Sequence, residues 1–149
     1  MTAELWVTTL VGLAAAAEDL ARRTVSNWIP LAALAGGIVC QSVARGWRGL
    51  AAAALGAAGG YAVFFLFYWL CGRGGGDVKL MAGFGALLGP SRLPEGLFWT
   101  SLTGGLIAAA VLMAAWLRSV GGRSGPAPRA IPYAPAIAVG TWLALVGEG

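Results

Sequence analysis

Two aspartates, Asp19 and Asp77, are the residues of this chain best suited to chemistry. Asp77 lies within the segment GRGGGDVKLMAG, residues 72–83, beside three glycines and just after the apolar run YAVFFLFYWLC. Asp19 follows an earlier apolar run that begins near Leu5. A carboxylate in or beside hydrocarbon is energetically costly, so each aspartate needs either a structural partner or a use.

The other side chains narrow the possible reactions. The chain contains no His, and its two cysteines, Cys40 and Cys71, stand in separate apolar runs. A zinc site would have almost no ligands, and catalysis by Ser-His-Asp or Cys-His groups is excluded. We therefore expect neither a metal nor a cofactor.

A pair of carboxylates can still hydrolyse a peptide bond. Two carboxylates at one site do not both ionise easily, so one of them keeps a proton. The ionised carboxylate can take a proton from water while the protonated one polarises the carbonyl under attack. Structural roles stay open beside this one. Asp77 could cap a helix near Lys79, and Asp19 could pair with Arg22 or Arg23 at the lipid headgroups.

The elements that must position these residues are membrane helices. Of the 149 residues, 58% are hydrophobic and only 11% are charged, against about 25% charged in soluble domains. We predict an all-α, polytopic membrane protein with about six transmembrane helices. The six apolar runs cover residues 5–17 (extending to 21), 28–44, 50–71, 80–88, 96–117 and 132–146. Stretches of small residues, AAAALGAAGG and TGGLIAAA, predict faces where helices pack closely.

Charge predicts the orientation of these helices. With the N-terminus outside, the inside segments carry Arg22, Arg23, Arg73, Lys79, Arg118, Arg123 and Arg129, and the outside segments carry Arg45, Arg48 and Arg92. This excess favours the N-outside arrangement under the positive-inside rule. Asp19 and Asp77 then lie at the same depth on the cytoplasmic side. A cleaved signal peptide is a weaker alternative for the first run, because MTAELW has no basic residue and carries Glu4.

Three segments resemble type IV prepilin peptidases. GGGD, residues 74–77, reads as the family's GxGD motif and continues as DVKLMAGFGALLG. EDLARRTVSNW, residues 18–28, is similar to the family's first motif, with Val25-Ser26 where the family has Ile-Pro before Asn27. IPYAPAIAVG, residues 131–140, resembles the family's C-terminal segment. The three matches occur in order along most of the chain.

The resemblance implies an aspartic endopeptidase of the bacterial inner membrane that cuts the basic leader from prepilins at the cytoplasmic face. Asp19 and Asp77 would be the catalytic pair. Gly74 and Gly76 would shape the active-site loop, and Lys79 and Asn27 would support the site. Glu18 is left with two interpretations, a contact for a leader lysine or a plain solvated helix end.

The length of the chain is similar to that of the short peptidases of tight-adherence (Flp-type) pilus systems. We expect a single transmembrane peptidase domain, residues 1–149, with no soluble zinc-binding methyltransferase insert. The expected partners are a prepilin and the lipid bilayer, and no nucleic acid. Two alternatives remain. One is a related GxGD peptidase that acts on preflagellin-like substrates. The other is a small proton-coupled membrane transporter, whose acidic residues would tend to lie near the bilayer midplane.

Overall fold

The structure, a computed structural model, describes residues 3–22, 24–71, 75–120 and 133–147, and these residues form helices and short connections without a strand. The helices are α1 (Ala3–Arg22), α2 (Trp28–Arg45), α3 (Trp47–Cys71), α4 (Gly75–Val120) and α5 (Ala134–Val146). The predicted all-α class is therefore confirmed. Within the described residues, the six apolar runs coincide with helices, and α4 carries two of them.

Three of the helices, α2, α3 and α4, are long and apolar enough to cross a membrane, and α5 is apolar but shorter. This composition agrees with a membrane protein. The number of crossings and the side on which the N-terminus lies stay predictions.

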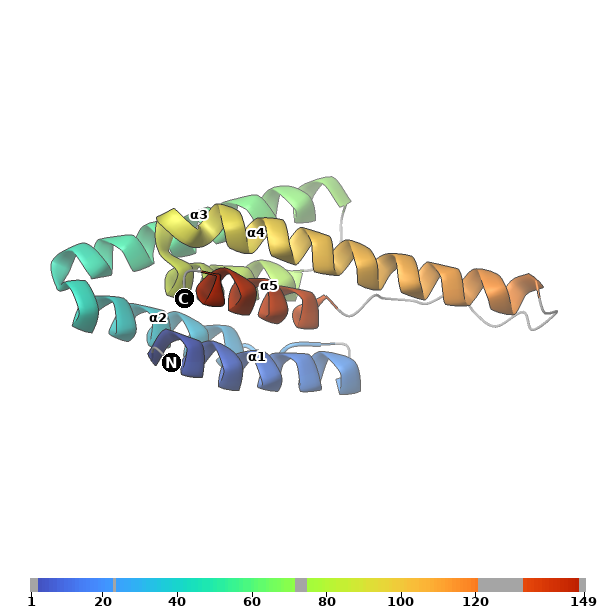
Figure 1. Ribbon diagram of the computed structural model, residues 1–149, viewed down its shortest axis with the longest axis horizontal. Helices are drawn as coiled ribbons and strands as arrows, with labels where there is room; N and C mark the ends of the chain where they lie inside the picture. The colour runs from blue at the N-terminus through green and yellow to red at the C-terminus, as the bar shows by residue number, and fades with distance from the viewer. Residues whose placement is uncertain (1–2, 23, 72–74, 121–132, 148–149) are drawn as a thin grey trace.

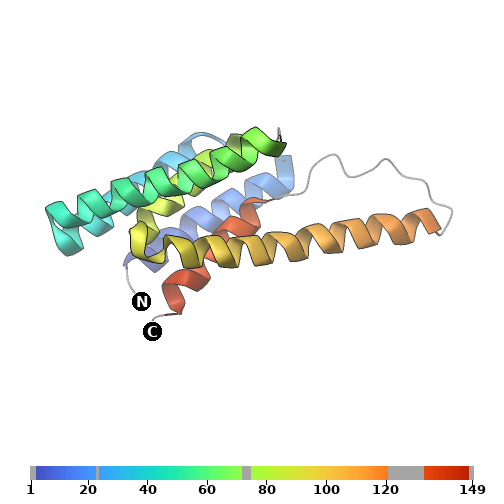
Figure 2. The same cartoon turned by 90° about the horizontal axis from the view of Figure 1, so that it is seen from above.

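Helix α4 is broken at Gly89, where the chain doubles back (Figures 1 and 2). Gly89 has φ 65° and ψ 175°, a backbone conformation that is essentially reserved for glycine. Pro90 follows at once and has no N–H to continue the helical hydrogen bonds. Buried Gln41 of α2 donates from Nε2 to the carbonyl oxygen of Leu87 at 3.1 Å, in the last turn before the break. The break divides α4 into a first arm, residues 75–88, and a second arm, residues 90–120.

The first arm of α4 is the centre of the molecule. Its residues from Leu80 to Leu88 are almost all buried, and α4 as a whole packs against α2, α3 and α5. Glycines bring α3 close to this arm. A Cβ at Gly56 would meet the backbone oxygen of Gly85, and one at Gly60 would lie 2.6 Å from the oxygen of Met81. The prediction that the small residues of the third run form a packing face is confirmed.

The helices run between two ends of the molecule. At one end, α1 begins and α5 finishes near the break in α4 (Figure 1). An ion pair joins Arg92 to Glu4 there, with 3.4 Å between the nitrogen and the oxygen. Asp19 lies at the other end of α1, about 22 Å from Glu4 at the helical rise of ~1.5 Å per residue.

Candidate active site

Asp19 lies in the last turn of α1 with its side chain turned inward. Its residue is only 8% exposed. Its Oδ2 accepts a hydrogen bond from the backbone N–H of Ala134 at 3.0 Å, across 115 residues of sequence. Ala134 is the first residue of α5, where backbone N–H groups have no partner inside the helix and the helix dipole favours a negative charge. Asp19 is therefore held by a helix terminus and not by Arg22. Arg23, the other partner considered for it, lies outside the described residues.

Asp77 lies in the first turn of α4, as the sequence predicted, and is half-buried. Gly76, expected in a loop, lies instead in this same first turn, because α4 begins at Gly75. It is exposed, and a Cβ added to it would meet no atom within 4 Å. Gly74, the other glycine of the motif, lies outside the described residues.

The structure brings Asp19 and Asp77 into electrostatic range of each other. Tyr133, at the N-terminal boundary of α5, lies close enough to Asp77 for their charges to interact as well. The Tyr133 ring packs edge-on against Phe64 at 6.3 Å between centroids. The last turn of α1 and the N-terminal ends of α4 and α5 therefore lie at one end of the molecule, where each carboxylate is within reach of the other's charge.

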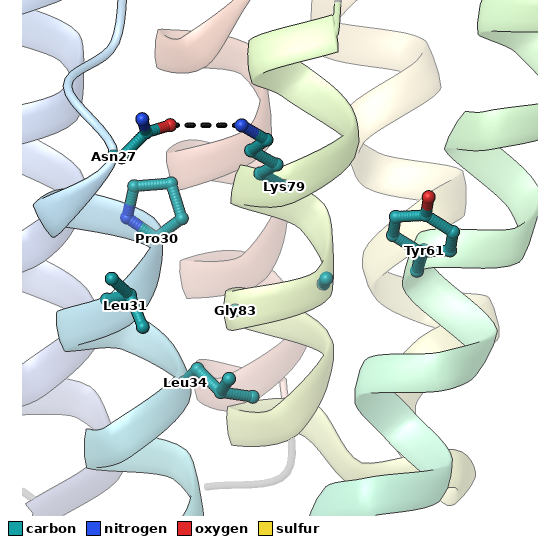
Figure 3. Close-up of a pocket in the computed structure, with 8 residues that line it drawn as sticks. Asn27, Pro30, Leu31, Leu34, Tyr61, Lys79 and Gly83 are labelled. Atoms are coloured by element: carbon teal, nitrogen blue, oxygen red, sulfur yellow. Dashed lines mark hydrogen bonds between the residues drawn. The ribbon is translucent and has the colours of Figure 1, made fainter.

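Asn27, the N-cap residue of α2, also meets Lys79 of α4 (Figure 3). Lys79 Nζ donates to Asn27 Oδ1 at 3.1 Å. Residues two apart on a helix point to different sides, so Lys79 faces α2 while Asp77 faces the α1–α5 side. Asp77 is therefore not tied to Lys79, the partner considered for it in a purely capping role.

A pocket of about 340 Å³ opens beside the Asn27–Lys79 pair. It lies between α2, α3 and α4, with the polar pair at one end and leucines of α2 further along (Figure 3). Its lining residues are Asn27, Pro30, Leu31, Leu34, Tyr61, Lys79, Ala82 and Gly83.

Glu18 has a role that neither sequence interpretation named. Its two carboxylate oxygens accept both donors of Ser26: the backbone N–H at 2.9 Å and the side-chain hydroxyl. Glu18 lies just after the apolar run 5–17. The bond from the Ser26 hydroxyl, and after it the bond from the Ser26 backbone N–H, hold the pKa of the Glu18 carboxyl below its usual value. The motif EDLARRTVSNW showed the acid and the serine, but their pairing depends on how the chain turns after α1.

The sequence also missed Tyr133 and the Ala134 N–H. The resemblance pointed to the segment IPYAPA without assigning a role to either residue. Among the described residues, no group of three or more His, Cys, Asp or Glu side chains could hold a metal ion.

Comparisons with known proteins agree on one family. The sequence profile of the type IV leader peptidase family matches residues 6–109, which include Asp19, Asn27, Asp77 and Lys79. A prepilin leader peptidase/N-methyltransferase from Aeromonas hydrophila is 30% identical over 135 residues, covering 86% of this chain and 43% of that protein.

Two further relatives carry the same name. The protein from Neisseria gonorrhoeae is 37% identical over 105 residues, covering 66% of this chain and 32% of its own length. The Bacillus subtilis protein is 36% identical over 92 residues, covering 60% of this chain and 34% of its own length. This chain therefore spans less than half the length of each of these relatives. No solved structure matches it.

Proposed function

Because the chain belongs to the type IV leader peptidase family, we propose that it is a membrane aspartic endopeptidase that removes the basic leader from prepilins. Asp19 and Asp77 are its catalytic pair. The observation that carries the proposal is the convergence of these two carboxylates, from α1 and α4, at one end of the molecule. The names of the relatives support the substrate class.

The two aspartates have different surroundings, which suggests different roles. Asp19 is held by the Ala134 N–H at the start of α5, and we assign it the role of the general base that takes a proton from water. Asp77 carries the other proton and donates it toward the carbonyl oxygen of the scissile peptide. The water oxygen bonds to the carbonyl carbon to give a diol. The C–N bond then breaks as the leaving nitrogen takes the proton that Asp19 removed from water, and the diol returns a proton to Asp77 as it becomes the new carboxyl group. This division needs no metal, thiol or imidazole.

The remaining motif residues support this pair. Lys79 and Asn27 hold α4 against the start of α2. Gly76 leaves backbone beside Asp77 open to an extended substrate segment, since a peptide bond inside a helix is shielded from attack. The open space around Gly76 supports this role. Gly74, which lies outside the described residues, would shape the same active-site segment.

We further propose that the protein lies in the bacterial inner membrane, with about six crossings, its N-terminus outside and the aspartates at the cytoplasmic face. The distribution of Lys and Arg supports this orientation. The preferred substrate is an Flp-type prepilin.

One observation weighs against the transporter alternative. Acids that couple transport tend to lie near the bilayer midplane, whereas Asp19 is in the last turn of α1 and Asp77 in the first turn of α4. A preflagellin-like substrate would be cleaved by the same pair of aspartates, so a cleavage experiment must distinguish it from a prepilin.

The test is a cleavage assay in membranes. The protein is co-expressed with an Flp-type prepilin, and the mobility shift of the substrate is followed for the wild type, Asp19→Asn and Asp77→Asn, each checked for membrane insertion. We expect each variant to lose at least about 100-fold in rate, the usual contribution of a general acid or base. Glu95→Gln, at an exposed acid near the other end of the molecule, is the matched control and should cleave normally.

Cleavage that survives in either aspartate variant would return that residue to a structural role. A wild type that cleaves a preflagellin-like substrate but no prepilin would favour the second peptidase hypothesis. Proton-coupled uptake by a wild type that cleaves neither substrate would favour the transporter.

A further inference from the structure

Asp19 and Asp77 stand on two helices that have little direct contact. Helix α1 packs chiefly against α5 and α2 and barely touches α4. The relative position of the two carboxylates must therefore be set through other elements. One of these is α5, whose Ala134 N–H holds Asp19.

The second link runs through the connection between α1 and α2. Glu18 adjoins Asp19 in the last turn of α1 and accepts both donors of Ser26. The next residue, Asn27, accepts the hydrogen bond of Lys79 at 3.1 Å. Lys79 lies on α4, two residues after Asp77. This Glu18–Ser26–Asn27–Lys79 chain joins the helical turn that carries Asp19 to the turn that carries Asp77.

We propose that Glu18 is a positioning residue, which through Ser26 and Asn27 sets the placement of the Asp19 turn relative to the Asp77 turn. The inference rests on the proposed function of the two aspartates. A displacement of reacting groups by about 1 Å can lower a rate by about 100-fold, so a link that aligns two helices can govern the rate without touching the substrate.

The geometry of the Glu18–Ser26 pair fits this task. Two donors on one residue meet two oxygens of one carboxylate, and paired bonds of this kind to a charged group fix orientation as well as distance. A proline at position 26 would hold the turn by its ring but could not make the backbone bond, because it has no N–H. In this chain, the serine at position 26 and the acid at position 18 therefore act together.

Cleavage kinetics of Glu18→Ala, Ser26→Ala, the double variant and Ser26→Thr test the proposal. Glu18→Ala removes both acceptor oxygens and should lower kcat by about tenfold, an order of magnitude below the cost of a 1 Å displacement, with KM changed by less than about twofold. Ser26→Ala keeps the backbone N–H and should lower kcat less. The double variant should be no slower than Glu18→Ala, because Glu18→Ala already removes the whole link. Ser26→Thr keeps both donors and should retain most of the wild-type kcat. Glu95→Gln serves again as the control.

A second measurement tests the positioning role of Glu18 without relying on prepilin cleavage. Spin labels are placed at the exposed residues Ala21 of α1 and Gly75 of α4, each changed to Cys in a chain whose Cys40 and Cys71 are replaced by Ser. The distance distribution between the labels should broaden in Glu18→Ala and remain narrow in Glu95→Gln, whether or not a prepilin is cleaved.

Either of two results would overturn the proposal. One is an unchanged distance distribution in Glu18→Ala. The other is a rise in KM with wild-type kcat, which would make Glu18 a contact for the basic leader instead. Loss of cleavage by the wild type itself, with the distribution behaving as expected, would reject the peptidase function and leave the positioning role of Glu18 standing.

Discussion

At the scale of single residues, the proposed catalytic role of Asp19 can be separated from its structural role in holding α5. Asp19→Asn keeps a side-chain oxygen that can accept the Ala134 N–H, whereas Asp19→Ala leaves this buried N–H without its partner. An unsatisfied buried donor costs about 1–3 kcal/mol. We expect Asp19→Ala to lower the free energy of unfolding by this amount and Asp19→Asn to change it little. Thermal unfolding in detergent measures the difference, and equal melting temperatures for both variants would contradict the role of the bond.

Gly76 offers a second test at this scale, because fold and function predict opposite effects. A Cβ at Gly76 meets no atom within 4 Å, so Gly76→Ala should leave the helix unchanged or stabilise it by up to about 1 kcal/mol. If the open backbone beside Asp77 receives the substrate, the Gly76→Val variant should cleave prepilin more slowly than the wild type although the variant is folded. Cleavage rate and melting temperature are measured on the same samples. Full activity in Gly76→Val would remove the substrate role.

The sequence could identify Asp19, Asn27, Asp77 and Lys79 as candidates because motif spacing is local. It could not identify their partners. The Ala134 N–H lies 115 residues from Asp19, and Asn27 lies 52 residues from Lys79. Such pairings depend on how helices pack. Lys79 is an example. The sequence suggested that Lys79 is a neighbour of Asp77, whereas in the structure its side chain turns toward α2 and bonds to Asn27.

At the scale of the elements, the hairpin in α4 is the feature that the apolar pattern described least well. Two runs, 80–88 and 96–117, were predicted as separate spans, and the first was too short to span by itself. The structure makes that short run the buried centre of the molecule. Hydrophobicity predicts that a segment avoids water, but it does not distinguish a lipid-facing helix from one enclosed by other helices.

The sharp turn of that hairpin depends on one glycine. Gly89 adopts φ 65° and ψ 175°, and a side chain there would also approach Gln41 Nε2 at 3.3 Å. Gly89→Ala should therefore destabilise the protein by about 1–3 kcal/mol. The matched control is Gly105→Ala in the second arm, where a Cβ meets nothing and the change should be neutral or stabilising. A melting temperature for Gly89→Ala equal to that of the control would show that the turn tolerates a side chain.

At the scale of the whole molecule, the distribution of polar groups divides the protein into two ends. The Glu4–Arg92 ion pair lies at the end where α4 turns. Both aspartates and the Asn27–Lys79 pair lie at the other. Helix α3, with 25 residues, joins the two ends and reaches about 37 Å, more than the ~30 Å hydrocarbon core of a bilayer. The ends are therefore far enough apart to lie on opposite sides of a membrane.

Charge predicts which end faces the cytoplasm: when the N-terminus is placed outside, the outside segments carry fewer basic residues than the inside segments. The exposed residues Ser91, after the α4 turn, and Thr24, after α1, are suitable reporters. Each is changed to Cys in the chain that lacks its own cysteines, and intact cells are treated with a membrane-impermeant maleimide. Ser91→Cys should be labelled at once, and Thr24→Cys only after the membrane is opened. The reverse pattern would place the aspartates outside, where the basic leader that a prepilin keeps in the cytoplasm could not reach them.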